Sequence, residues 1–104
     1  MTDRIARIKE MLTNQPGDAF LRHALALEYV KAGAIEAART TFEELLAEQP
    51  DYVGSYYHLA KLYESEGATD AAIQWYQRGM EVAQRVGDRH AFNELRSAWE
   101  ELTF

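Results

Sequence analysis

A 34-residue internal repeat constrains this chain more than any other feature of its sequence. The only two prolines, Pro16 and Pro50, lie 34 residues apart. When residues 19–52 are aligned with residues 53–86, the small and apolar positions match while most charged positions do not. The matched pairs are Leu25 with Leu59, Ala26 with Ala60, Tyr29 with Tyr63, Ala38 with Ala72, and Phe42 with Tyr76. A period that is kept only at packing positions indicates a structural repeat.

Each repeat has the pattern of two antiparallel helices joined by a tight turn. Apolar residues recur three or four positions apart on both sides of Gly33 in the first copy and of Gly67 in the second. This spacing is typical of amphipathic helices. Glycine favours the left-handed conformation that ends many helices, so each glycine predicts the turn within a hairpin. Proline fits the first turn of a helix but not its interior, so Pro16 and Pro50 separate one hairpin from the next.

Asp18 and Asp51 follow the two prolines and are candidate N-caps, because a carboxylate there accepts a backbone hydrogen bond. Apolar periodicity before Pro16 and after Asp88 adds one helix at each end of the chain. Repeat stacks expose an apolar face at each end and need such caps to stay in solution. The sequence therefore predicts an all-α fold with six helices, at about 3–14, 18–32, 35–48, 52–66, 69–86 and 88–102.

This pattern resembles the tetratricopeptide repeat, a 34-residue helix–turn–helix with fixed small and large sites. With Ala19 and Val53 as position 1, the small residues fall at positions 8 and 20, and the aromatic residues fall at positions 11 and 24. The two copies differ at positions 4, 27 and 32, which hold Arg22, Leu45 and Pro50 in the first and Tyr56, Gly79 and Gln84 in the second. Because Gln84 replaces a proline, the helix that contains it is expected to continue to about Val86.

The resemblance implies a small two-repeat, bacterial-type tetratricopeptide protein whose hairpins stack as a short right-handed superhelix. Residues 1–104 are expected to form one domain, and Met1 together with the closing helix leads us to expect a nearly complete chain. A compact antiparallel bundle of an unrelated type is the alternative, and the 34-residue period argues against it. The expected parts are a helix of a partial repeat at 3–14, repeat one at 19–52, repeat two at 53–86 and a capping helix at 88–102.

Composition argues against several classes of function. Seventeen acidic and eleven basic residues give a net charge of −6, which disfavours nucleic acid and anionic membrane surfaces as partners, because both attract clustered Lys and Arg. The absence of cysteine excludes disulfides, Cys-type zinc sites and iron–sulfur clusters. No apolar run is long enough to span a bilayer, and the N-terminus lacks an apolar signal core. We therefore expect a cytoplasmic protein.

The sequence contains no recognisable catalytic constellation. The histidines His23, His58 and His90 form no HExxH pair, no serine lies in a G-x-S-x-G motif, and the glycines form no phosphate-binding loop. We expect no enzymatic activity, no cofactor and no metal. Three interpretations of the histidines stay open: half-buried polar residues, an anion contact that responds to pH near 6.5, or a metal site.

The resemblance also implies a partner-binding groove, because in that family the first helix of each repeat lines a concave face. The expected function is a non-catalytic adaptor or scaffold that binds a peptide segment of another protein. The candidate groove residues are Phe20, His23, Leu27 and Val30 in repeat one, Tyr57, His58 and Lys61 in repeat two, and His90 in the closing helix.

Two alternatives to this groove concern apolar residues near the chain ends. In the first alternative, Phe20 packs on the N-terminal helix and takes no part in binding. In the other, the chain forms a homodimer through the closing helix, which carries Trp99, Leu102 and Phe104.

The clamp with which one subclass of the family binds chaperone C-termini is absent. That clamp needs Lys at position 5 and Asn at position 9 of one repeat, and Asn at position 6 of the next. The corresponding residues here are His23, Leu27 and His58. Binding to chaperone tails is therefore not expected.

Overall fold

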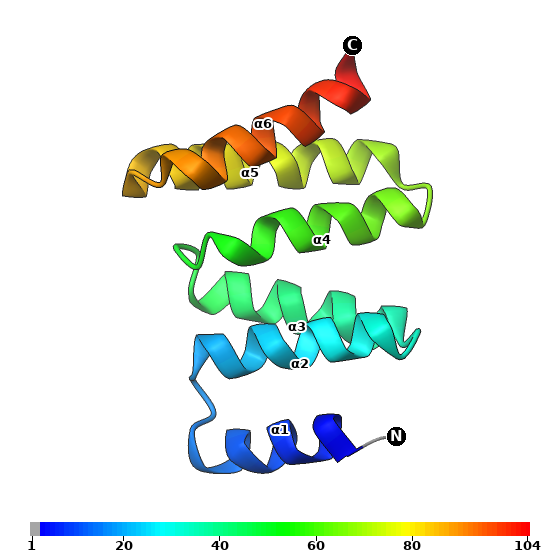
Figure 1. The fold of residues 1–104 in the computed structure, drawn as a ribbon, viewed down its shortest axis with the longest axis vertical. Helices are drawn as coiled ribbons and strands as arrows, with labels where there is room; N and C mark the ends of the chain where they lie inside the picture. The colour runs from blue at the N-terminus through cyan, green and yellow to red at the C-terminus, as the bar shows by residue number, and fades with distance from the viewer. Residues whose placement is uncertain (1–2) are drawn as a thin grey trace. The chain divides into compact units, whose positions relative to one another are not determined.

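The computed structural model describes residues 3–104, which contain six α-helices and no strand (Figure 1). This arrangement confirms the all-α prediction, and each helix begins and ends within two residues of its predicted bounds. The helices are α1 (Asp3–Asn14), α2 (Ala19–Lys31), α3 (Ile35–Glu48), α4 (Gly54–Ser65), α5 (Thr69–Val86) and α6 (Arg89–Thr103).

The chain divides into two compact units, Met1–Gln49 and Pro50–Phe104. The first unit contains α1 and the hairpin α2–α3, and the second contains the hairpin α4–α5 and α6. The division falls close to the boundary between the two sequence repeats. The single domain over residues 1–104 stays a prediction.

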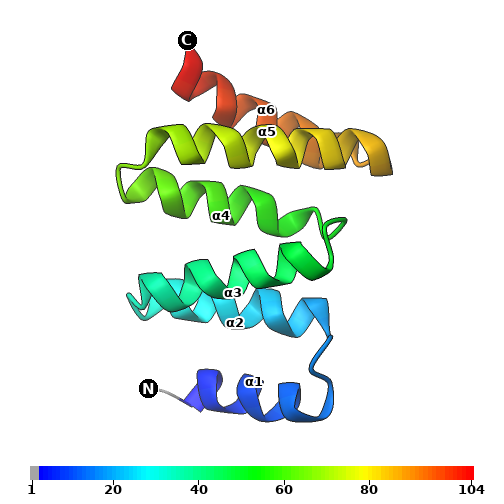
Figure 2. The ribbon, with the colours of Figure 1, turned by 180° about the vertical axis from the view of Figure 1, so that it is seen from behind.

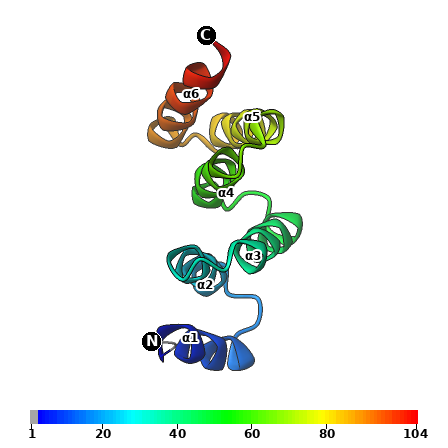
Figure 3. The same cartoon turned by 90° about the vertical axis from the view of Figure 1, so that its right-hand side faces the viewer.

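In the first unit, α2 and α3 lie side by side and α1 lies against the other side of α2 (Figures 1 and 3). Ala26 and Ala38 are fully buried, as expected for the small sites that let two helices approach closely. Asp18 caps α2, because its carboxylate accepts a 3.0 Å hydrogen bond from the backbone N–H of Leu21. The rest of this core consists of Ile8, Leu25, Phe42, Leu45 and Leu46.

In the second unit, α5 packs against both α4 and α6 (Figure 2). Ala60 and Ala72 are fully buried, at the positions that match Ala26 and Ala38 of the first unit. Asp88 caps α6 by accepting a 3.0 Å hydrogen bond from the backbone N–H of Ala91. The larger core residues are Tyr56, Leu59, Leu62, Tyr76, Val82 and Leu95.

Gly33 and Gly67 form the turns within the two hairpins, as predicted. Their φ angles are +78° and +79°, which lie in the left-handed region where a Cβ atom is strained. In each turn the N–H of the residue after the glycine reaches back to a helix carbonyl: Ala34 to Tyr29 at 2.9 Å, and Ala68 to Tyr63 at 3.0 Å. These are the hydrogen bonds of a glycine-terminated helix.

One predicted cap is wrong. Asp51 does not cap α4, because that helix begins at Gly54 and Val53 occupies the cap position without a side-chain hydrogen bond. Asp18 directly precedes α2, whereas two residues separate Asp51 from α4. The carboxylate of Asp51 instead accepts a 2.7 Å hydrogen bond from Arg85 of α5.

The replacement of proline by Gln84 has the predicted consequence. Helix α5 continues through Gln84 to Val86 and ends at Gly87, whose φ is +81°. It is the longest of the described helices, with 18 residues.

Candidate functional site

The first unit exposes an apolar stripe along α2. Phe20 is 68% exposed and Val30 is 37% exposed, while Leu27 is half-buried between them. Their spacing of seven and three residues places the three side chains on one side of the helix. The high exposure of Phe20 shows that α1 does not bury this ring, which argues against the alternative in which Phe20 packs there. We call these three residues the α2 stripe.

His23 lies on α2 but belongs partly to the core. Its half-buried ring meets the edge of the Phe42 ring, with the centroids 5.8 Å apart and an angle of 66° between the planes. An imidazole held against an aromatic ring in this way has little freedom to turn toward a ligand.

In the second unit, α4 brings together three of the predicted residues. The ring of Tyr57 meets the ring of His58 edge-on at 5.7 Å, and the Lys61 ammonium lies 5.7 Å from the Tyr57 centroid. We call Tyr57, His58 and Lys61 the α4 cluster. It offers an aromatic surface, a cation and an imidazole within two turns of one helix.

Residues of α5 and α6 set the electrostatics around the α4 cluster. The Tyr76 hydroxyl donates a 2.9 Å hydrogen bond to Glu64, whose carboxylate lies 3.9 Å from the Lys61 ammonium. Burial, together with this hydrogen bond to Glu64, raises the pKa of Tyr76 above its ordinary value. Partial burial lowers the pKa of His58, and the Glu94 carboxylate of α6 opposes that shift.

Sequence reasoning missed the contributions of Tyr76 and Glu94. Tyr76 matched Phe42 in the repeat and therefore carried only a packing signal, although its hydroxyl adds a polar contact that phenylalanine lacks. For Glu94, the repeat register with Leu95 at position 7 places it on the groove side of the closing helix, but does not predict its effect on His58. Its role depends on the packing within the second unit, which no local pattern reveals.

His90 lies apart from the α4 cluster in sequence, at the exposed start of α6. Residues 3–104 contain no group of three or more His, Cys, Asp or Glu side chains that could hold a metal ion. Of the three interpretations of the histidines, a half-buried polar residue describes His23, whereas His90 is exposed. His58 is exposed over part of its surface, yet it is buried enough for its pKa to be lowered.

The geometry of two matched helical hairpins, each with a fully buried Ala pair, is also the geometry of a known family. The family model for the tetratricopeptide repeat matches residues 23–80, more than half of the chain. The chain belongs to the tetratricopeptide repeat family. Members of this family are in general non-catalytic modules that bind other proteins.

Relatives support this membership over most of the chain. The TPR repeat-containing protein PA0015 of Pseudomonas aeruginosa is 28% identical over 91 residues, which cover 88% of this chain and 87% of that protein. The solution structure of a tetratricopeptide repeat domain protein from Salinibacter ruber is 46% identical and has a TM-score of 0.81, covering 84% of this chain and 88% of that one.

A further solved tetratricopeptide-like structure is protein BPP2914 of Bordetella parapertussis. It is 25% identical with a TM-score of 0.82, and the match covers 95% of this chain and 86% of that one. MamA, at 21% identity and a TM-score of 0.73, shares the fold.

Among the described residues of this tetratricopeptide protein, none of the helices has the length and apolar character needed to cross a membrane.

Proposed function

We propose that this tetratricopeptide protein is an adaptor that binds peptide segments of partner proteins, and that the α2 stripe of its first unit and the α4 cluster of its second are each a binding face. The observation that carries the proposal is the exposure of Phe20, at 68%, beside Leu27 and Val30 on one helix. Such an apolar stripe supports an anchor site, because a partner side chain that covers it removes apolar surface from water, which is favourable in free energy.

The two faces suit different kinds of peptide side chain. The α2 stripe suits an apolar anchor, since Phe20, Leu27 and Val30 are all apolar, with the charge of Lys31 at one end of the stripe. The α4 cluster suits polar recognition, because Lys61 and His58 offer hydrogen bonds while the Tyr57 ring offers a flat surface. We expect micromolar affinity, since the chain has only two repeats.

A selection of peptides from a displayed random library, with the full chain as bait, tests this function. Each selected peptide is measured against Leu27→Glu for the first unit and Tyr57→Ala for the second. The matched controls are Ala47→Glu on α3 and Gln74→Ala on α5, both at exposed positions. We expect Leu27→Glu to weaken binding at least about tenfold, because it places a charge in an apolar contact, while both controls bind as the wild type does.

Two results would reject the adaptor function at these faces. One is a set of peptides that bind Leu27→Glu and Tyr57→Ala as tightly as the wild type. The other is a selection that yields no peptide with measurable affinity for the folded chain.

A second candidate function is self-association through α6. Phe104 is 91% exposed and meets the Trp99 ring edge-on, with the centroids 6.0 Å apart. The exposed Phe104 ring beside the half-buried Trp99 favours a dimer in which the two copies bury the same surface. Sedimentation of the wild type and of Phe104→Glu distinguishes the cases: a dimer that the substitution abolishes supports self-association, and a wild type that stays near 12 kDa at high concentration rejects it.

A further inference from the structure

Helix α1 carries a face that corresponds to a buried face of α3 but is exposed. Moving 34 residues back along the chain takes Ala38 and Leu45 of α3 to Arg4 and Met11 of α1. Ala38 and Leu45 are fully buried, whereas Met11 is 45% exposed and the Arg4 side chain is 63% exposed. Within residues 3–104, α1 therefore lacks the hairpin partner that α2 provides for α3.

The exposed face is hollow and carries two positive charges. Arg4, Arg7, Ile8 and Met11 line an open hollow of about 360 Å³. Ile8 is only 6% exposed and forms an apolar floor beside Met11, while the two arginines supply guanidinium groups. We call these four residues the α1 face. An apolar floor with two adjacent cations fits a ligand that is itself apolar and negatively charged.

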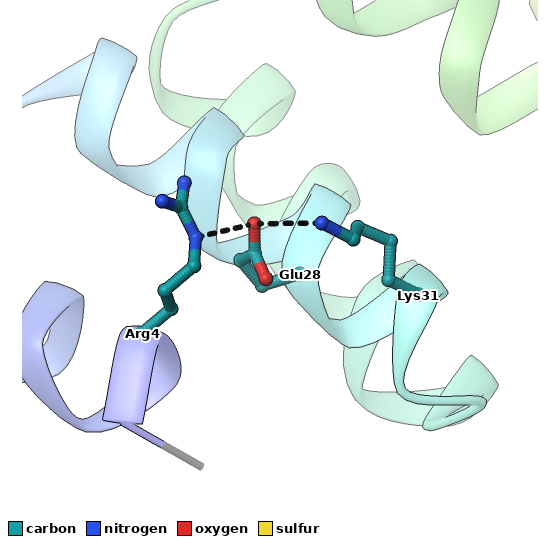
Figure 4. Close-up of polar contacts among 3 residues, drawn as sticks. All are labelled: Arg4, Glu28 and Lys31. Carbon is teal, nitrogen blue, oxygen red and sulfur yellow. Dashed lines mark hydrogen bonds and ion pairs between the residues drawn. The ribbon is translucent and has the colours of Figure 1, made fainter. Parts of the chain in front are cut away.

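The guanidinium of Arg4 is held in place from one side. Its Nε donates a 3.0 Å hydrogen bond to the Glu28 carboxylate, which is 14% exposed and also lies 3.8 Å from the Lys31 ammonium (Figure 4). The two terminal nitrogens of Arg4 point away from Glu28 in the same view. Because a guanidinium has five N–H donors, the terminal nitrogens can donate hydrogen bonds to a second carboxylate while Nε stays paired with Glu28.

The repeats show what kind of element covers such a face. In the first unit the face of α3 that includes Ala38 is covered by the helix that carries Ala26, and both alanines are fully buried. Arg4 stands where α3 has Ala38, so a helix with alanine at the matching place would bury the terminal nitrogens of the guanidinium without an acceptor, leaving Glu28 as its single partner on that side. A helix with Asp or Glu at that place would satisfy it.

A second copy of this chain does not meet that requirement. Among the described residues, α6 is the helix after the second hairpin and has no hairpin partner of its own. Its N-cap fixes its register in the repeat, because Asp88 precedes Arg96 by eight residues, as Asp18 precedes Ala26. Stacking of α6 on the α1 face in hairpin register would therefore set Arg96 against Arg4. Like charges at a close helix contact disfavour that assembly.

We propose that the α1 face is a docking surface for an amphipathic helix of a partner protein that presents a carboxylate between its apolar residues. The helix takes the place that α2 takes on α3, with its carboxylate on Arg4 and Arg7 and its apolar residues on Ile8 and Met11. This surface is separate from the α2 stripe and the α4 cluster.

The test uses three fluorescently labelled peptides and the full chain. Each peptide has the sequence of residues 18–33, a first helix of the repeat, either unchanged or with Ala26→Glu or Ala26→Arg. Because Ala26 is fully buried in its own hairpin, the Ala26→Glu peptide cannot replace α2 without burying a charge. Fluorescence anisotropy gives the affinity of each peptide for the wild type and for Arg4→Glu, Arg7→Glu and a control, Arg89→Ala on α6.

We expect the wild type and Arg89→Ala to bind the Ala26→Glu peptide at least about tenfold more tightly than the Ala26→Arg peptide, as a charge-assisted hydrogen bond predicts. Arg4→Glu should reverse this order. Arg7→Glu should weaken binding of the Ala26→Glu peptide while it leaves the pair of Arg4 with Glu28 intact. This variant therefore tests the proposal even if Arg4→Glu disturbs the fold.

Three results would overturn the proposal. The first is equal affinity of the wild type for the three peptides, or no binding of any of them. The second is the same preference in all four proteins. The third is a wild type that prefers the Ala26→Arg peptide or sediments as head-to-tail chains, which would mean that a second copy occupies the face.

Discussion

At the scale of single residues, Gly79 and Tyr56 show that two departures from the repeat pattern form one packing solution. A Cβ atom on Gly79 would lie 2.7 Å from the Cβ of Tyr56 and 3.0 Å from Cδ1 of Leu95. The first repeat has Leu45 at the position of Gly79 and Arg22 at the position of Tyr56. The guanidinium of Arg22 donates a hydrogen bond to Glu48 at the protein surface. With glycine at position 79, the backbone of α5 approaches the Tyr56 Cβ and the Leu95 side chain more closely than any larger residue would allow.

We predict that Gly79→Ala destabilises the second unit by about 1–2 kcal/mol. Overpacking against Tyr56 outweighs the gain of roughly 1 kcal/mol that alanine brings to a helix interior. Urea denaturation of the full chain measures the change. Gly54→Ala is the matched control, because a Cβ there has no neighbour within 4 Å, so a Gly79→Ala chain as stable as this control would contradict the packing argument.

His58 gives a prediction for the dependence of stability on pH. Partial burial lowers its pKa in the folded state, so the unfolded chain, with a pKa near the ordinary 6.5, takes up the proton first as pH falls. The contribution of His58 to stability is thus intact above about pH 6.5 and is lost as the pH falls from there through the folded-state pKa. An NMR titration should place the His58 midpoint below 6.5.

Glu94→Gln provides the control for this titration. The Glu94 carboxylate opposes the burial effect, so its removal should lower the pKa of His58 further. A midpoint above 6.5 in the wild type would show that burial does not dominate, and a higher midpoint in Glu94→Gln than in the wild type would show that Glu94 does not raise the pKa of His58.

The buried alanines could be predicted from sequence, while the surroundings of His58 could not. Ala26, Ala38, Ala60 and Ala72 recur with the period, since each repeat needs the same close helix contact. The pKa of His58 depends on Glu94 of another helix, and nothing in the local sequence marks that contact.

At the scale of helices, the start of each element depends on the exact place of its cap. Asp18 and Asp88 stand directly before α2 and α6, and both accept a hydrogen bond from the backbone N–H three residues later. Asp51 directly follows Pro50, whereas Asp18 stands two residues after Pro16, so Asp51 lies one place earlier in the repeat than Asp18. Residue type alone therefore suggested a cap that the spacing does not allow.

We predict that Asp18→Ala and Asp88→Ala each destabilise the protein by about 1 kcal/mol, the usual cost of losing an N-cap. Asp51→Ala should cost only a few tenths of a kcal/mol, because its pair with Arg85 is largely exposed and screened by solvent. Urea denaturation of the three variants side by side checks the difference. Equal losses at Asp51 and Asp18 would show that Asp51 does more than form a surface ion pair.

At the scale of the whole molecule, the period predicts the fold but not the binding faces. The period fixes the small and large sites inside each hairpin, which identify the family and four helices, and apolar periodicity outside the repeats adds α1 and α6. Exposed side chains do not follow it: Phe20 and Leu27 of the first repeat correspond to Gly54 and Lys61 of the second. Because a surface is free to vary while the core is kept, each repeat carries its own recognition chemistry.

The α1 face illustrates the same separation between period and function. Arg4 and Met11 lie in register with buried residues of α3, yet they are exposed because α1 has no hairpin partner among the described residues. Periodicity predicts that α1 is a helix of a partial repeat. Only the structure shows that its uncovered side carries two arginines over an apolar floor.

An NMR map of peptide binding tests the central claim of the account most directly. The isotope-labelled full chain is titrated with a peptide from the library selection, and the shift of every backbone amide is followed. The account predicts that the largest shifts fall on α2 around Phe20, Leu27 and Val30, and on α4 around Tyr57, His58 and Lys61. Shifts confined to the exposed sides of α3 and α5 would contradict it, because the first helices would then not be the binding faces.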